Sequence, residues 1–169
     1  MKKAIPILLI AVLLLGAVIF VNRGGQEPEA AQAPAEGAVV CSFETTDFDG
    51  NAVDSGIFAD YALTMINFWE PWCGPCVAKM PDLQKLQDDY ADKGFLLIGV
   101  YSTEDGVAQV LESTGVSYPI LRYTEDFAYF QTGYVPTTVF VNSGGEMVGS
   151  VQIGARSYDE WAAIVEELL

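Results

Sequence analysis

A buried strand that runs into two closely spaced cysteines and then a helix is the feature that most constrains this fold. Residues 62–69 (ALTMINFW) form a mostly apolar run of strand length, which is typical of a strand covered on both faces. Cys73 and Cys76 follow, and from there to Lys93 apolar residues recur every three or four positions, which predicts a helix. The two thiols are therefore expected where a buried strand meets the N-terminus of a helix.

The rest of residues 38–169 alternates between strand and helix patterns. An Asp49-Gly50 turn predicts a leading hairpin, and a capping box at Ser157 opens a last helix. Further strands are expected at 39–43, 95–101, 118–121, 137–142 and 147–153; further helices are expected from 103–105 to Gly115 and over 124–131. This alternation favours an α/β fold, a sheet with helices on both faces.

The N-terminal end has the pattern of a membrane anchor. Lys2 and Lys3 precede 18 uncharged residues (4–21), which as a helix would span about 27 Å, close to a bilayer core. We expect residues 1–21 to form a transmembrane signal anchor with a cytoplasmic N-terminus, so that the rest of the chain is exported. A cleaved signal peptide stays open as the alternative. The composition of residues 22–37 predicts a flexible linker. Residues 38–169 are expected to form one domain.

Composition excludes several classes of function. The 169 residues contain no histidine, which rules out Ser-His-Asp and Cys-His hydrolases and histidine-based zinc sites. The net charge is −15, so the chain is a poor partner for nucleic acid. A zinc site would need four ligands, and only Cys41 and carboxylates remain beside the cysteine pair, so we expect no metal. We interpret Cys41 as a small buried apolar residue, with a regulatory or intermolecular thiol as the alternative.

The cysteine pair has the asymmetry that thiol–disulfide exchange needs. Unpaired N–H groups and the helix dipole favour a thiolate on Cys73 at the helix N-terminus. Cys76 is one turn further in, so it can displace a substrate from Cys73 and leave a Cys73–Cys76 disulfide. Pro75 fits the first helical turn. Sixty residues later Pro136 stands at the entrance of an apolar strand, where proline indicates an edge, a bulge or a cis bond.

WCGPC after NFW, with a VPTT strand and a GG hairpin downstream, resembles the thioredoxin superfamily. The anchor, the leading hairpin and an extra α-β-α segment between 102 and 134 make it most similar to membrane-anchored TlpA-like thiol–disulfide oxidoreductases. The resemblance implies a central mixed sheet flanked by helices. It implies that Cys73 attacks, Cys76 resolves, Trp72 covers Cys73 and Pro136 is cis. It also implies that the Val135 backbone meets an extended substrate segment.

The family also implies the partners of the reaction. These are disulfide-containing exported proteins and a membrane electron donor of the CcdA/DsbD type, with no dissociable cofactor. The Gly74-Pro75 pair between the cysteines matches reducing members of the superfamily. We therefore predict an extracytoplasmic reductase. A disulfide oxidase, a structural disulfide without turnover, and a non-catalytic peptide-binding module are the alternatives.

The chain departs from its relatives at two positions. Many thioredoxins carry a buried Asp where this chain has Asn67, so another group must take the proton of the second thiol, and Glu70 is the candidate. The alternative, which is the commoner case for a loop carboxylate, is that Glu70 is solvated. Reductases dedicated to cytochrome c maturation often have an acidic residue three positions after the second cysteine. Lys79 stands there, which argues against an apocytochrome substrate.

Overall fold

The computed structural model describes residues 39–130 and 132–169. The expected anchor, residues 1–21, and linker, residues 22–37, lie outside this part of the chain. Within the described residues, no helix combines the length and the apolar character that crossing a membrane requires.

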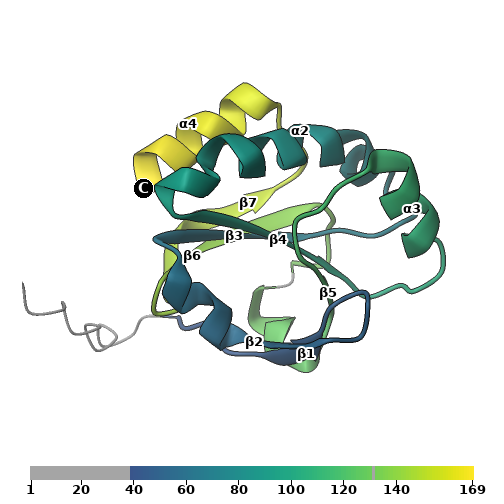
Figure 1. Ribbon diagram of the computed structural model, residues 1–169, viewed down its shortest axis with the longest axis horizontal. Helices are drawn as coiled ribbons and strands as arrows, with labels where there is room; N and C mark the ends of the chain where they lie inside the picture. The colour runs from purple at the N-terminus through teal and green to yellow at the C-terminus, as the bar shows by residue number, and fades with distance from the viewer. Residues whose placement is uncertain (1–38, 131) are drawn as a thin grey trace, which may run out of the picture. The chain divides into compact units, whose positions relative to one another are not determined.

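A five-stranded mixed sheet forms the centre of the domain, as the resemblance implies (Figure 1). Its strands, in spatial order, are β5 (Ile120–Arg122), β4 (Phe95–Tyr101), β3 (Leu63–Phe68), β6 (Thr137–Asn142) and β7 (Met147–Ile153). Strands β3, β4 and β5 run parallel, whereas β6 is antiparallel to both β3 and β7. The register pairs Phe68 with Thr137, so the segment after β3 and the segment before β6 meet at one end of the sheet.

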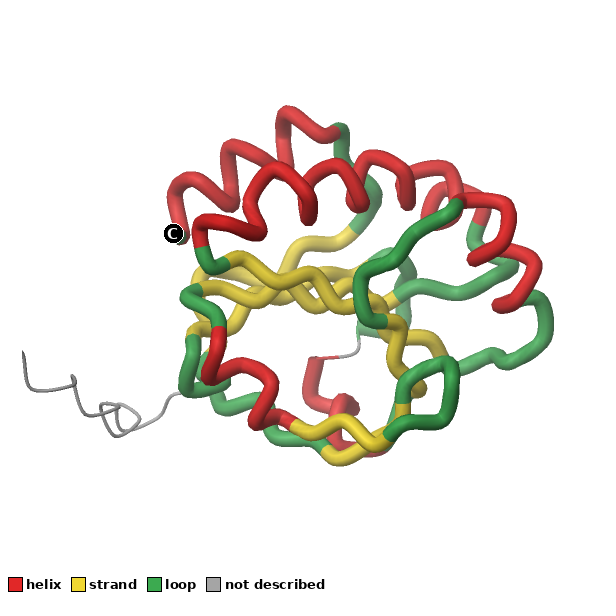
Figure 2. The backbone as a smooth tube through the Cα atoms, in the orientation of Figure 1, coloured by secondary structure: helices red, strands yellow, loops and turns green. Residues whose placement is uncertain are grey.

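Three α-helices cover one face of this sheet: α2 (Gly74–Tyr90), α3 (Val107–Thr114) and α4 (Tyr158–Leu168) (Figures 1 and 2). Their apolar residues pack against every second residue of the strands, because side chains alternate between the faces of a sheet. Buried members of this layer include Met65, Trp69, Leu97, Phe140, Met80 and Trp161.

The prediction of helices on both faces is only partly correct. The second face is covered by the hairpin of β1 (Glu44–Thr46) and β2 (Ala52–Asp54) and by two 3₁₀ helices, η2 (Ser55–Asp60) and η4 (Glu125–Phe130) (Figure 1). Phe127 of η4 is fully buried there, with its ring 4.8 Å from that of Phe43 and 5.9 Å from that of Phe68.

Two expected elements have other bounds than the sequence predicts. Residues 39–43 make no strand beyond a bridge from Val40 to Glu146, because Cys41 and Phe43 are used for packing in the second layer. Helix α3 begins at Val107 rather than at 103–105, since Gly106 before it is left-handed (φ 92°) and the Thr103 N–H is bonded elsewhere. The element at 125–130 is a 3₁₀ helix, and η2 was not predicted at all.

Other local signals are confirmed. The leading hairpin turns at Gly50 (φ 91°), and Asp47 accepts hydrogen bonds there from the side chain and backbone of Asn51, which lower the pKa of Asp47. The capping box of α4 is formed by Ser157 and Glu160. The strands at 95–101, 137–142 and 147–153 have the predicted bounds.

Candidate active site

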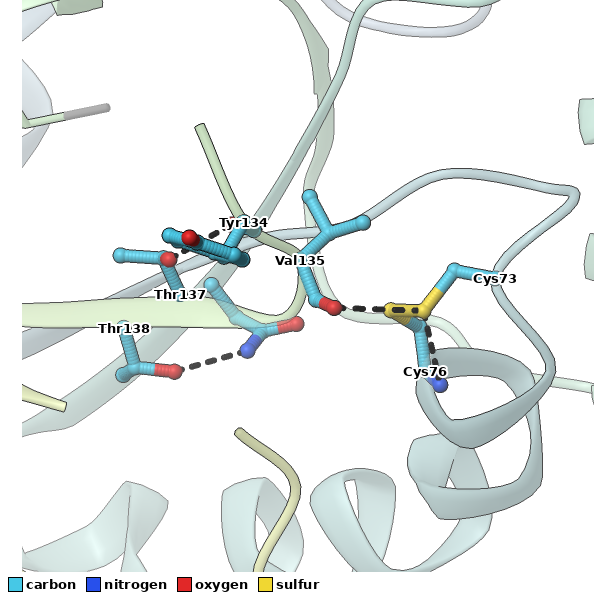
Figure 3. Close-up of a disulfide and its surroundings, with 7 residues drawn as sticks. Cys73, Cys76, Tyr134, Val135, Thr137 and Thr138 are labelled. Atoms are coloured by element: carbon cyan, nitrogen blue, oxygen red, sulfur yellow. Dashed lines mark hydrogen bonds between the residues drawn. A yellow bond between two sulfur atoms is a disulfide. The ribbon is translucent and has the colours of Figure 1, made fainter. Parts of the chain in front are cut away.

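The two cysteines lie where the strand–helix junction was predicted. Cys73 is the N-cap of α2 and Cys76 lies in its first turn, and a disulfide joins them with Cα atoms 5.3 Å apart (Figure 3). The Cys73 sulfur accepts a hydrogen bond from the Cys76 N–H at 3.3 Å. A helix stabilises a negative charge most at its N-terminus, on an atom that accepts a hydrogen bond from an N–H group of the first turn. The geometry therefore favours a thiolate on Cys73 once the bond is reduced.

The loop before β6 faces this disulfide. The Val135–Pro136 peptide bond is cis, and the Val135 carbonyl oxygen lies 3.7 Å from the Cys73 sulfur (Figure 3). Thr137 Oγ1 donates to the Tyr134 carbonyl at 2.7 Å, and the Pro136 carbonyl accepts from Gly154 at 2.8 Å. These bonds fix the loop from both sides, so its backbone is held directly opposite Cys73.

Exposure does not separate the two cysteines, which are 5% and 4% exposed. The two cysteines differ in their surroundings. Cys73 faces the Val135 carbonyl, whereas Cys76 lines a cavity of about 10 Å³ together with Lys79, Pro136 and Arg156. Asn67 lines the same cavity and donates to Thr138 Oγ1 at 2.8 Å, which ties β3 to β6 beneath the site.

A larger pocket of about 380 Å³ opens on the other side of the loop. Trp72 and Tyr134 line this pocket and are 70% and 69% exposed, so both stand at its rim. That Trp72 covers Cys73 stays a prediction. Tyr134 was not predicted as a site residue, although the sequence has an aromatic residue directly before the Val135-Pro136 pair. The pocket is lined by Phe68, Glu70, Trp72, Ser102, Gly133, Tyr134, Val135 and Thr137.

Glu70 is a buried carboxylate with a structural set of contacts. It is 6% exposed, accepts hydrogen bonds from the Ser102 and Thr103 N–H groups at 3.1 and 2.9 Å, and is also bonded to the Ser102 hydroxyl. Its backbone carbonyl accepts from the Cys73 N–H at 3.0 Å. Glu70 is therefore not the solvated loop carboxylate considered above. It joins the cysteine loop to the loop after β4, and it does not line the cavity beside Cys76.

Replacing Glu70 by Gln should destabilise the domain by about 1–3 kcal/mol. The variant keeps the shape but turns one acceptor oxygen of a buried side chain into an N–H₂ donor that faces the partly buried Ser102 and Thr103 N–H groups. Urea unfolding of wild type and Glu70→Gln measures this difference. Glu112→Gln, an exposed change on α3, is the matched control and should stay within about 0.5 kcal/mol. Equal stability of Glu70→Gln and Glu112→Gln would contradict the role of Glu70 as a tie between the loops.

Cys41 is free and 2% exposed in the second layer. Burial, with a smaller contribution from the negative charge of Asp126, raises its pKa to about 12, so it stays a protonated thiol at neutral pH.

We therefore expect the reduced native protein to react with a thiol reagent at Cys73 and Cys76 and to leave Cys41 unmodified until it is denatured. Mass spectrometry after alkylation at neutral pH, with and without urea, gives the count. Fast native labelling of Cys41 would contradict its assignment to the core.

The described residues contain no group of three or more His, Cys, Asp or Glu side chains that could hold a metal ion. The chemistry available at this end of the sheet is that of the cysteine pair. The fold and this pair together define a thioredoxin-like redox protein.

Comparison with known proteins agrees with that class. The model of the Redoxin family matches residues 29–128, and the chain belongs to this family. Within the thioredoxin superfamily it is a TlpA/ResA-like protein. The thiol-disulfide oxidoreductase ResA of Oceanobacillus iheyensis is 32% identical over 108 residues, which cover 62% of this chain and 56% of that protein. ResA of Bacillus cereus is 24% identical over 95% of this chain and 93% of its own length.

Solved structures share the fold. A thioredoxin-family thiol:disulfide interchange protein from Chlorobium tepidum has a TM-score of 0.68 and 26% identity, covering 82% of this chain and 99% of that one. StoA from Bacillus subtilis has a TM-score of 0.62 and 21% identity, covering 76% and 98%. These findings place the chain among thiol–disulfide oxidoreductases.

Proposed function

We propose that this chain is an extracytoplasmic enzyme that reduces disulfides in exported proteins by cycling between a Cys73/Cys76 dithiol and disulfide. The observation that carries the proposal is the position of the Cys73 sulfur. It accepts from the helix N-terminus, lies against a fixed backbone carbonyl and has a second thiol within bonding reach.

The proposed reaction has two exchange steps. The Cys73 thiolate attacks one sulfur of a substrate disulfide, forms a mixed disulfide and releases the other substrate sulfur as a thiolate, which takes a proton from water. The Cys76 thiol then loses its proton, attacks Cys73 Sγ and breaks the mixed disulfide. The substrate gains two electrons and leaves as a dithiol, and the enzyme is left with the Cys73–Cys76 disulfide.

The loop opposite the disulfide would bind the substrate. We assign the Val135 backbone and Pro136 to an extended substrate segment, since this loop is fixed and faces Cys73. Gly74 and Pro75 are the first two residues of α2, and a Cβ added at Gly74 would meet no atom within 4 Å beyond its chain neighbours, so the surface beside Gly74 is open to a substrate. The rim residues Trp72 and Tyr134 offer apolar surface to the segment that flanks the substrate cysteine.

The cellular setting is part of the same proposal. Residues 1–21 would anchor the chain with its N-terminus in the cytoplasm, residues 22–37 would be the tether, and residues 38–169 the extracytoplasmic domain. Spent enzyme would be re-reduced by a membrane electron donor of the CcdA/DsbD type. The excess of carboxylates makes nucleic acid an unsuitable partner.

Trapping tests this function. In Cys76→Ala the mixed disulfide cannot be resolved, so an oxidised substrate protein should stay attached to Cys73, and peptide mapping identifies the site. Absence of any adduct, together with a Cys73–Cys76 bond that resists mild reductant in wild type, would support a binding module without turnover. The reduction potential decides direction: about −270 mV would favour a reductase, whereas about −120 mV would favour an oxidase.

A further inference from the structure

Basic residues are scarce in this domain, and two of them share a cavity with the second cysteine. Of the eight Lys and Arg residues, Lys2, Lys3 and Arg23 precede the domain, and so do three of the 23 acidic residues, which leaves five basic residues against 20 acidic ones. Lys79 and Arg156 line the cavity that Cys76 also lines, and no carboxylate lines it. They come from different elements, because Lys79 is on α2 whereas Arg156 lies in the loop between β7 and α4.

We propose that Lys79 and Arg156 stabilise the thiolate of Cys76 during the resolving step of the proposed function. Cys76 is buried, and burial opposes ionisation of a thiol. Two cations at the same cavity counteract that cost, since a positive charge a few ångströms from a thiolate lowers its energy most where water is excluded. The remaining lining residues supply no charge: Asn67 from β3, Leu83 from α2, Pro136 and Ala155 from loops, and Trp161 from α4.

Neighbouring contacts hold both cations in place. Lys79 Nζ lies 3.0 Å from Asp82 Oδ2, and the Arg156 guanidinium stacks 5.0 Å above the Trp161 ring while donating to Gln152 Oε1 at 2.6 Å. Asp82 and Glu160 are the carboxylates that act on these cations from outside the cavity. Both carboxylates weaken the effect of the cations, but neither lines the cavity, where Lys79 and Arg156 are the only charged side chains.

The cavity also gives the proton of Cys76 a place to leave. A volume of about 10 Å³ is close to the smallest that holds one water, and such a water needs polar partners, which Asn67, Lys79 and Arg156 supply. Deprotonation of Cys76 would then pass through this water to solvent along the partly exposed Lys79 side chain. This arrangement does not require Glu70, whose oxygens are bonded to the loop after β4.

Single-turnover kinetics with a neutral disulfide isolate the resolving step. When reduced protein is mixed with one equivalent of dithiodipyridine, attack by Cys73 releases the first thiopyridone, and attack by Cys76 releases the second. Lys79→Gln and Arg156→Gln should each slow the second phase about threefold, and the double variant about tenfold, whereas the first phase should stay within about twofold. The pH at which the second phase reaches half its maximal rate should rise in the variants.

Two matched variants keep the test sharp. Lys85→Gln removes a cation from the same helix, outside the cavity, and should leave both phases unchanged. Lys79→Arg keeps the charge and should retain the wild-type second phase. An unchanged second phase in the Lys79/Arg156 double variant, or an equal loss of both phases, would overturn the proposal. Loss of the first phase in wild type would instead overturn the proposed function.

Discussion

Cys73→Ser should reduce insulin in the presence of dithiothreitol at least about a hundredfold more slowly than the wild-type domain. The serine hydroxyl cannot form a mixed disulfide. No other described thiol has the N-cap position of Cys73, because Cys76 is buried inside the first turn of α2 and Cys41 is buried in the core. The rate of insulin precipitation, corrected for dithiothreitol alone, measures the loss.

Cys76→Ala is the informative companion, since it keeps the attacking thiol. It should form adducts with oxidised substrate at a near-normal rate and accumulate them instead of turning over. If Cys73→Ser reduces insulin as fast as wild type, the assignment of Cys73 as the attacking residue is wrong.

Phe127→Ala should cost about 3–5 kcal/mol in the free energy of unfolding. The side chain is fully buried and its ring packs against those of Phe43, Phe68 and Tyr123, so truncation removes buried area and leaves a cavity between the sheet and the layer above it. Urea or thermal unfolding provides the measurement.

Tyr129→Ala is the control for this prediction. Tyr129 belongs to the same 3₁₀ helix but is 72% exposed, so its truncation should stay within about 0.5 kcal/mol. If Phe127→Ala were as stable as Tyr129→Ala, the 3₁₀ helices and the hairpin would not form a packed second layer over the sheet.

Sequence patterns were sufficient where an element depends on its own residues. The strands at 95–101, 137–142 and 147–153 and the capping box at Ser157 have strong local signals, and the structure has them at the predicted positions. The strand–cysteine–helix junction was predictable for the same reason. Its chemistry follows from two residues three positions apart on a helix N-terminus.

Sequence patterns failed where a residue that is distant in the sequence determines the local structure. The apolar run at 39–43 was read as a strand, but Cys41 and Phe43 pack into the second layer, a choice that depends on η2 and η4. Helix α3 starts later than predicted because the Thr103 N–H donates a hydrogen bond to Glu70, which lies in another loop. The cavity that joins Cys76, Lys79 and Arg156 was invisible for the same reason, since only the fold brings these segments together.

The most direct test of the central claim is to find which sulfur of the reduced protein reacts first. Brief treatment with iodoacetamide at neutral pH, followed by peptide mapping, measures the labelling rate of each cysteine. A thiolate at the N-cap of α2 predicts that Cys73 is labelled first and several-fold faster than glutathione. Labelling of Cys76 before Cys73, or of both at the rate of an ordinary free thiol, would contradict the account.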